Sequence, residues 1–336
     1  MEKPPAERLF QMITGFALSQ SIYVAARLGV ADLLKDGPKG PAELAESVAA
    51  DRNALARLLR FLAGHRIFAE RADGRFELTP LAECLQADAP GSMRTRALFW
   101  GQESVWRPWG ELLYSVRTGL PAFDHIYGVG AFDYLAANSE AAALYHETMN
   151  AQAEWESAAV VAAYDFSAAR KIADVGCGDG SFVAAVLKAH RGARGVLFDQ
   201  PHVIEKAKAR LAADGLLDRC EPLAGNFFES APAGGDVYVL KHVIHNWDDD
   251  RAIAILKNCR ATVAKSGKIL IVDCVIRPGN EPDLGKFIDV HMMVRQFGRE
   301  RTESEYRALL AAAAFDLTRI VPTRSQVSVI EGVPSQ

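Results

Sequence analysis

Residues 171–180 read Lys-Ile-Ala-Asp-Val-Gly-Cys-Gly-Asp-Gly, and this stretch decides the fold. A short β run at residues 171–175 leads directly into a glycine-rich turn, and Ser181–Ala189 then has the apolar spacing of a helix. A strand, a glycine-rich turn and a helix in this order predict the first unit of an open α/β sheet. Ligands bind beyond the carboxyl ends of the strands in such a sheet, so the turn is a candidate binding site.

The same alternation of strands and helices continues toward the C-terminus. Short β runs recur at residues 195–198, 221–223, 236–240 and 268–272, with helical segments at residues 203–213 and 249–264. This pattern predicts a doubly wound, Rossmann-like and mostly parallel sheet with helices on both faces. The closing runs, residues 317–322 and 326–329, are separated by a short Thr-Arg-Ser turn, so they predict an antiparallel hairpin at one edge.

The N-terminal part has a different texture, helical and rich in Ala and Leu. Residues 41–49 and 53–63 have helical spacing, and Asp73-Gly74 then marks a hairpin turn. Two helices followed by a two-stranded wing are the order of a winged-helix module. Residues 1–90 contain 11 Lys and Arg against 12 Asp and Glu. Because contact with phosphates needs a basic face, we expect a dimerisation or scaffold module rather than a DNA-binding one.

Length and composition limit the classes of protein that fit. The chain has 336 residues, of which 49% are hydrophobic, and a net charge of −4. At roughly 100–200 residues per domain, this length predicts two domains. The hydrophobic fraction excludes a disordered chain, and the charge gives no general attraction to nucleic acid or to an anionic membrane.

The cysteines and the N-terminal sequence indicate a location in the cytoplasm. Five cysteines are dispersed without a Cys-x-x-Cys pair, which argues against a disulfide framework and a structural zinc site. The first residues are mixed in charge and rich in Pro, unlike a signal peptide. The longest uncharged stretch, residues 9–26, contains Gln11, Thr14, Ser19, Gln20 and Ser21. It therefore predicts a buried or dimerising helix rather than a bilayer span.

An aromatic bridge joins the two parts of the chain. Residues 96–160 hold four of the five tryptophans. Most such rings belong to a core or an interface, but their density between two domains also fits a pocket for a flat aromatic ligand. We take Phe99, Trp100, Trp106 and Tyr145 as candidates for acceptor binding. The predicted parts are residues 1–95, 96–165 and 166–336.

The turn after the first strand is suited to a nucleoside. Asp199 ends the second strand, 19 residues after Gly180, where a carboxylate can hold ribose hydroxyls. A dinucleotide fingerprint places its third glycine one residue later, where Ser181 stands. A pyrophosphate also needs a helix N-terminus without acids, whereas Asp179 lies there. These residues disfavour an NAD-dependent dehydrogenase.

Four segments in chain order resemble the plant-type small-molecule family of class I S-adenosylmethionine-dependent O-methyltransferases. They are residues 174–180, Phe-Asp-Gln-Pro-His-Val-Ile at 198–204, Lys-His-Val-Ile-His-Asn-Trp-Asp-Asp at 241–249 and Gly-Arg-Glu-Arg-Thr at 298–302. The likeness covers nearly the whole chain and is closer to the bacterial branch, which acts on aromatic polyketides, phenazines and similar secondary metabolites. It implies O-methylation of an aromatic hydroxyl, with S-adenosylhomocysteine as the second product, by a homodimer joined through its N-terminal domain. No group of residues has the spacing of metal ligands in the sequence.

The resemblance also implies residue roles. It would place the methionine part of the cofactor at Gly176 and Gly178, the ribose at Asp199 and the adenine at Phe227. The full set of implied cofactor contacts is Asp174, Gly176, Gly178, Asp199, Gln200, Asn226, Phe227 and Lys241. Further implied acceptor contacts are Met149, Asn150, Asn246 and Met292. Three residues depart from the usual pattern. Asn226 and Asn246 stand where family members often have Asp, and Asp273 stands where plant enzymes usually have Glu.

His245 is the candidate general base. Methyl transfer needs alignment and removal of the acceptor's proton, and imidazole suits that task near neutral pH. A carboxylate on the other ring nitrogen would fix the tautomer. His245 follows the run at 236–240 and Asp273 ends the next run, so both should lie at the ligand edge of the sheet. The resemblance adds Glu300, and we expect Asp273 and Glu300 to flank the imidazole.

Other functions fit the same residues. Some relatives of this family bind the cofactor without transferring its methyl group and act as hydroxylases or catalyse rearrangements. A regulator is a second alternative, in which the winged helix would bind DNA and the sheet domain would sense a ligand. The residue types do not define the acceptor's ring number, or whether a hydroxyl, a nitrogen or a carboxylate receives the methyl group.

Overall fold

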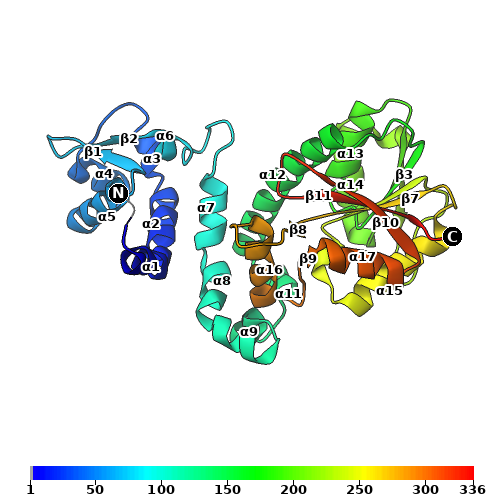
Figure 1. The fold of residues 1–336 in the computed structure, drawn as a ribbon. Helices are drawn as coiled ribbons and strands as arrows, with labels where there is room; N and C mark the ends of the chain where they lie inside the picture. The colour runs from blue at the N-terminus through cyan, green and yellow to red at the C-terminus, as the bar shows by residue number, and fades with distance from the viewer. Residues whose placement is uncertain (1–2) are drawn as a thin grey trace. The chain divides into compact units, whose positions relative to one another are not determined.

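The computed structural model describes residues 3–336 of the chain (Figure 1). They group into two compact units. The first consists of the residues up to Gly110 together with Asn138–Thr148, and the second of Glu111–Ala137 together with Met149–Gln336. The boundaries expected at residues 95 and 165 concern functional parts of the chain and stay predictions.

The first unit is mainly helical with one small hairpin. Its elements are α1 (Pro5–Ile13), α2 (Gly15–Arg27), α3 (Val30–Leu33), α4 (Pro41–Ser47), α5 (Arg52–Gly64), β1 (Phe68–Glu70), β2 (Phe76–Leu78), α6 (Pro80–Glu83), α7 (Arg94–Gly101), α8 (Glu103–Trp106) and the 3-10 turn η1 (Arg107–Glu111). β1 and β2 pair antiparallel around the predicted Asp73-Gly74 turn, where Gly74 has φ +76. Leu44, Leu59 and Phe76 are fully buried against one another in its core.

The uncharged stretch at residues 9–26 forms two helices rather than the one helix expected from its composition. α1 and α2 meet at an angle of 45°, and the Thr14 hydroxyl at the break donates to the main-chain oxygen of Phe10. α1 has no buried residue, and its apolar side chains Leu9, Phe10, Met12 and Ile13 are 58–70% exposed. Within residues 3–336 no single helix is long and apolar enough to cross a membrane. The bent pair α1–α2 together has the length and composition of a membrane span, by those two criteria alone.

The second unit contains the predicted sheet. Its seven strands follow the order β10-β11-β7-β6-β3-β4-β5. They are β3 (Lys171–Val175), β4 (Arg194–Asp199), β5 (Cys220–Ala224), β6 (Val237–Lys241), β7 (Lys268–Asp273), β10 (Phe315–Pro322) and β11 (Ser328–Pro334). β3 to β7 are parallel, and β10 and β11 form the antiparallel edge. The fold class predicted from the sequence is confirmed.

Helices cover both faces of this sheet (Figure 1). They are α12 (Ser139–Ala163), α13 (Ser181–Ala189), α14 (Pro201–Ala213), α15 (Asp249–Thr262) and α17 (Glu303–Ala312). The unit also contains α16 (Leu284–Arg295), which contacts the short helices α9 (Leu112–Thr118) and α10 (Ala122–Tyr127), and α11 (Ala131–Ala137). Neighbouring residues of β3 point to opposite layers. Ile172 packs with side chains from α12, α13 and α14, and Ala173 packs with side chains from α15 and α17.

The strand order reverses beside β3, and this positions the site. β3 pairs with β4 on one side and with β6 on the other. The chain therefore leaves these strands in opposite directions at their carboxyl ends, where open α/β sheets bind ligands. Among the remaining short elements, η3 (Ile244–Asn246) follows β6, β8 (Val275–Ile276) follows β7 and pairs with β9 (Arg301–Thr302), and η2 (Leu217–Arg219) directly precedes β5.

Candidate active site

The glycine-rich turn after β3 combines close packing with open space. Gly176, Gly178 and Gly180 have φ of +76, +55 and +75, a region that favours glycine. A Cβ on Gly176 would lie 2.6 Å from a methyl carbon of Val243, so this glycine lets the β3 and β6 loops touch. A Cβ on Gly178 would meet nothing within 4 Å. The turn thus leaves room for a ligand beside Gly178.

Two carboxylates face this turn. Asp199 accepts main-chain hydrogen bonds from Gly178 (3.0 Å) and Gln200 (2.7 Å). Asp174 is buried, and its Oδ2 has no hydrogen-bond partner among residues 3–336. Burial raises the pKa of Asp174 to about 7, and the charge of Asp199 adds to the effect. A ligand carrying positive charge would stabilise both carboxylates, and the sulfonium and ammonium groups of S-adenosylmethionine meet that requirement.

The residues expected near adenine form a braced turn. Asn258 donates to the main-chain oxygen of Phe227 (2.9 Å), and the Phe227 ring lies edge-on to Trp247 with centroids 6.2 Å apart. Asn226 accepts from the Phe228 N–H (3.0 Å) and donates its amide to Glu229 (3.0 Å). An Asp at position 226 could accept in the same way but could not donate to Glu229. The departure from the usual Asp therefore has a local structural reason.

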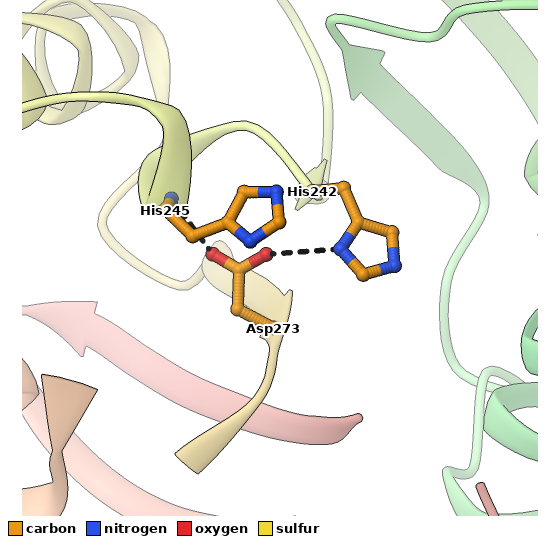
Figure 2. A group of neighbouring side chains, drawn as sticks. All are labelled: His242, His245 and Asp273. Atoms are coloured by element: carbon orange, nitrogen blue, oxygen red, sulfur yellow. Dashed lines mark hydrogen bonds and ion pairs between the residues drawn. The ribbon is translucent and has the colours of Figure 1, made fainter. Parts of the chain in front are cut away.

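His245 lies in η3, directly after β6. Its Nδ1 is 2.7 Å from Oε1 of Glu300, which is buried. Asp273 accepts from the main-chain N–H of His245 at 3.3 Å (Figure 2), so it holds the backbone while Glu300 holds the ring. Burial lowers the pKa of His245, but the negative charges of Glu300 and Asp273 outweigh it and raise the pKa to about 9. With Nδ1 engaged by Glu300, Nε2 is the ring nitrogen left for an acceptor.

The segment at residues 298–302 locks the turn that carries His245. The Arg299 N–H donates to the main-chain oxygen of His245 (2.8 Å). A Cβ on Gly298 would lie 2.3 Å from that oxygen, so a larger residue cannot fit without moving the turn. Arg301 is fully buried and donates to the main-chain oxygens of Ile244 (3.3 Å) and Trp247 (2.9 Å). The sequence drew attention to this segment for Glu300 alone.

Asn246 and Met292 meet at one glutamine. Asn246 donates to the main-chain oxygen of His242 (2.7 Å) and accepts from Gln296 Nε2 (2.7 Å). The same Gln296 nitrogen lies 3.5 Å from the Met292 sulfur. An Asp at position 246 could not donate to His242. Gln296 lies one residue past the end of α16, and no sequence signal had singled it out.

The other candidate acceptor residues lie in different parts of the chain. In the first unit, the Phe99 ring centroid is 5.5 Å from that of Trp100 and 6.1 Å from that of Tyr145. Trp106 is 43% exposed. Met149 and Asn150 lie on α12, and they are the first residues of that helix that belong to the second unit. Their contact with an acceptor stays a prediction.

Glu156, which the sequence analysis did not connect to the site, lies beside it. Glu156 on α12 is buried and bonded to Lys241 and His242. Among residues 3–336, one group has metal-ligand spacing: His242, His245 and Asp273 each place a ligand atom within 4.8 Å of the others (Figure 2). A metal on His245 would take a ring nitrogen that either Glu300 or the acceptor needs. The absence of a resident metal stays a prediction.

The parallel sheet is closed by an antiparallel hairpin, and its acids and its histidine gather where the strand order reverses. This is the arrangement of the class I methyltransferases, which use S-adenosylmethionine. Residues 109–316 match the family model of the O-methyltransferase domain, and residues 10–88 match that of the O-methyltransferase dimerisation domain. The chain belongs to this family and is an S-adenosylmethionine-dependent O-methyltransferase.

Similarity to individual relatives extends over nearly the full length. The chain is 44% identical to the phenazine O-methyltransferase PhzM of Lysobacter antibioticus, over 98% of this chain and 97% of that protein. The solved structure of the mitomycin 7-O-methyltransferase MmcR matches with a TM-score of 0.90 at 36% identity, over 98% of both chains. The O-methyltransferase NcsB1, solved with S-adenosylmethionine and 2-hydroxy-5-methyl naphthoic acid, matches with a TM-score of 0.81 at 31% identity, over 95% of this chain and 96% of that one.

Proposed function

We propose that the enzyme methylates a hydroxyl group of a flat, fused-ring aromatic metabolite of the phenazine or naphthoate class, with His245 as general base. The observation that carries this proposal is the 2.7 Å bond between His245 Nδ1 and the buried Glu300. It is the histidine–carboxylate pair that a base needs for a fixed tautomer and a stabilised imidazolium. The acceptor class is taken from the relatives that methylate a phenazine or bind a naphthoic acid.

The cofactor contacts are part of the proposal. S-adenosylmethionine supplies a methyl group already activated on a sulfonium. Asp199 would hold the ribose, because the bonds from Gly178 and Gln200 fix its carboxylate at the edge of the turn. Asp174 would face the positive charge of the methionine part. Gly176, Asn226, Phe227 and Lys241 would line the remaining length of the cofactor.

His245 would remove the acceptor's proton as the new bond forms. The acceptor oxygen bonds to the methyl carbon, the carbon–sulfur bond breaks with its electron pair going to sulfur, and the proton moves to Nε2. Because the pKa of His245 is raised to about 9, it lies close to that of a simple phenol, about 10. Proton transfer between groups of matched pKa is nearly balanced in energy, which favours efficient general-base catalysis. Holding the acceptor in line contributes further, about 7–11 kcal/mol in well-oriented systems.

We also propose that the working enzyme is a homodimer in the cytoplasm. Phe10, Met12 and Ile13, exposed apolar side chains of α1, belong to residues that match the dimerisation domain, and they would be buried in such a dimer. All five cysteines are free thiols, as a reducing compartment would keep them. The predicted domain boundaries near residues 95 and 165 would separate three parts of the chain: the dimerisation domain, the helical bridge with its acceptor contacts, and the cofactor domain.

The test is transfer of labelled methyl from S-adenosylmethionine to 1-hydroxyphenazine and 1,4-dihydroxy-2-naphthoate. We expect the wild type to label at least one of them on oxygen. His245→Ala should lower turnover at least a hundredfold, while cofactor affinity stays within a few-fold. His190→Ala, at the end of α13, is the matched control and should retain full turnover. Undiminished turnover in His245→Ala would remove the base, and a wild type that binds the cofactor but labels no hydroxylated aromatic would contradict the function.

A further inference from the structure

A second histidine–carboxylate pair lies beside the first. Glu156 on α12 is 0% exposed. Its Oε1 accepts from the side-chain amides of Gln152 (2.9 Å) and Gln326 (2.7 Å). Its Oε2 lies 2.7 Å from His242 Nε2 and 3.2 Å from Lys241 Nζ. Every lone-pair direction of this buried carboxylate is therefore occupied, and the group is fixed in one orientation.

The charge state of Glu156 follows from these contacts. Burial alone would favour the neutral acid. The neighbouring His242 and Lys241 reverse that preference and hold the pKa of Glu156 well below its usual range. Glu156 is thus an anion at any pH at which the enzyme works, and His242 Nε2 donates to it.

His242 adopts a backbone conformation that is uncommon for residues other than glycine. Its φ is +53, in the left-handed region. Such strain persists only where the surroundings over-determine it, and it is concentrated at functional sites. A turn that needed only this conformation would be served by Gly or Asn. What His242 adds beyond such residues is its imidazole, which contacts Glu156.

The second ring nitrogen of His242 points toward the base. His242 Nδ1 is 3.7 Å from Oδ1 of Asp273 (Figure 2). Neither atom has a hydrogen-bond partner within residues 3–336. The other oxygen of Asp273 accepts the main-chain N–H of His245. Glu156, His242, Asp273, His245 and Glu300 thus form a continuous row in which carboxylates and imidazoles alternate.

We propose that His242, anchored by Glu156, is a positioning residue that holds the Asp273 carboxylate in place and balances its charge behind the general base. The proposal rests on the proposed function, since it assigns His242 a role in the reaction of His245. An imidazole has a nitrogen on each side of its ring, so it can face two carboxylates at once, and in its protonated form it can donate to both. His242 acts through Asp273 and does not itself need to touch the acceptor.

Asp273 needs such a partner because it is completely buried. Burial raises the pKa of Asp273 and Glu300 adds to that effect, while His245, His242 and Arg301 lower it. The titratable and charged groups facing this carboxylate are His242, His245, Cys274, Glu300, Arg301 and Tyr306. Loss of His242 removes one of the three groups that lower the pKa of Asp273, so Asp273 should take up a proton at a higher pH. A protonated Asp273 is a weaker acceptor for the His245 N–H, and the turn that carries the base loosens.

The experiment compares His242→Asn, Asp273→Asn and the double variant with the wild type, using 1-hydroxyphenazine or 1,4-dihydroxy-2-naphthoate, whichever the wild type labels faster. Asn tolerates the left-handed backbone, so His242→Asn removes the imidazole while sparing the turn. We expect a loss of at least tenfold in kcat, with cofactor affinity within twofold. Because His242 acts through Asp273, the double variant should lose no more than about twofold beyond Asp273→Asn. His190→Asn is the control and should match the wild type.

The pH profile separates positioning from a merely structural role. The rise of kcat set by His245 should remain in both single variants, while the further loss of kcat that accompanies protonation of Asp273 at lower pH should move to higher pH in His242→Asn and disappear in Asp273→Asn. His242→Gly, which also accepts the left-handed backbone, should repeat the loss in kcat if the Asn variant is poorly folded. The proposal is overturned by a kcat within twofold of wild type, by multiplicative losses in the double variant, or by a parallel loss of cofactor affinity. If His245→Ala is impaired while His242→Asn is not, the proposed function stands and only this inference fails.

Discussion

At the scale of single residues, the protonation of His245 is set by Glu300. The pKa of His245 is raised to about 9 because the charges of Glu300 and Asp273 exceed the effect of burial. A general base works only when neutral, so the active fraction of the free enzyme grows as the pH rises toward that value. The carboxylate therefore has two effects: it fixes the tautomer and it strengthens the base.

Glu300→Gln should separate these two effects. Removal of the negative charge lowers the pKa of His245, so the rise of kcat/KM with pH should shift from about 9 to lower pH. The maximum should fall roughly tenfold or more, because a weaker base accepts the proton less readily. The measurement is kcat/KM between pH 6 and 10. A profile that keeps its break near pH 9 in the variant would show that Glu300 does not set the proton affinity of His245.

The sequence predicted the participants of this site better than their contacts. His245, Asp273 and Glu300 belong to recognisable segments, but Asp273 bonds the main-chain N–H of His245 where a ring contact was expected. Glu156 is separated from His242 by 86 positions. It lies on a helix whose pattern carries no sign of the partner, because only the folded topology brings α12 to the end of β6. Arg301 acts on main-chain oxygens, which have no sequence signature.

At the scale of elements, the central strands were the most predictable part. β3 was predicted with its observed limits, and β6 and β7 to within one residue at each end. Strands buried on both faces are continuous apolar runs, and the glycine and acid residues that follow them mark where they end. The break of residues 9–26 into two helices was not predicted, for a related reason. Its composition is uniformly uncharged, while the bend depends on the hydroxyl of Thr14 bonding within the preceding turn.

The exposed face of α1 leads to a prediction about assembly. Leu9, Phe10, Met12 and Ile13 leave an apolar surface uncovered in the single chain, and burial of such a surface is worth about 25 cal/mol per Å². Phe10→Asp should therefore shift the protein from dimer to monomer in light scattering after size exclusion. Val116→Asp on α9, at a similarly exposed position, is the control and should leave the mass unchanged. A Phe10→Asp protein that keeps the mass of the wild type would exclude α1 from the interface.

At the scale of the whole molecule, the two family matches and the two compact units divide the chain in broadly similar ways. The dimerisation domain, residues 10–88, lies within the first unit, and the sheet of the catalytic domain lies within the second. The sequence indicated this division through a change from helical to alternating texture. It could not indicate that Asn138–Thr148, far along the chain, groups with the N-terminal residues, because that depends on tertiary packing.

This division leads to a prediction for hydrogen exchange across the chain. All candidate cofactor contacts lie in the second unit. S-adenosylhomocysteine at about 100 times its Kd stabilises the binding conformation by about 2.7 kcal/mol, so exchange that requires opening of the site slows up to about a hundredfold. We expect this slowing around residues 174–180, 198–200 and 226–228, and none in the β1–β2 hairpin. Asp199→Asn should reduce this slowing of exchange. The amide has one acceptor oxygen where the carboxylate has two, so it holds the Gly178 N–H and the ligand less well. Equal slowing in β1–β2 would mean that the cofactor is bound by both units.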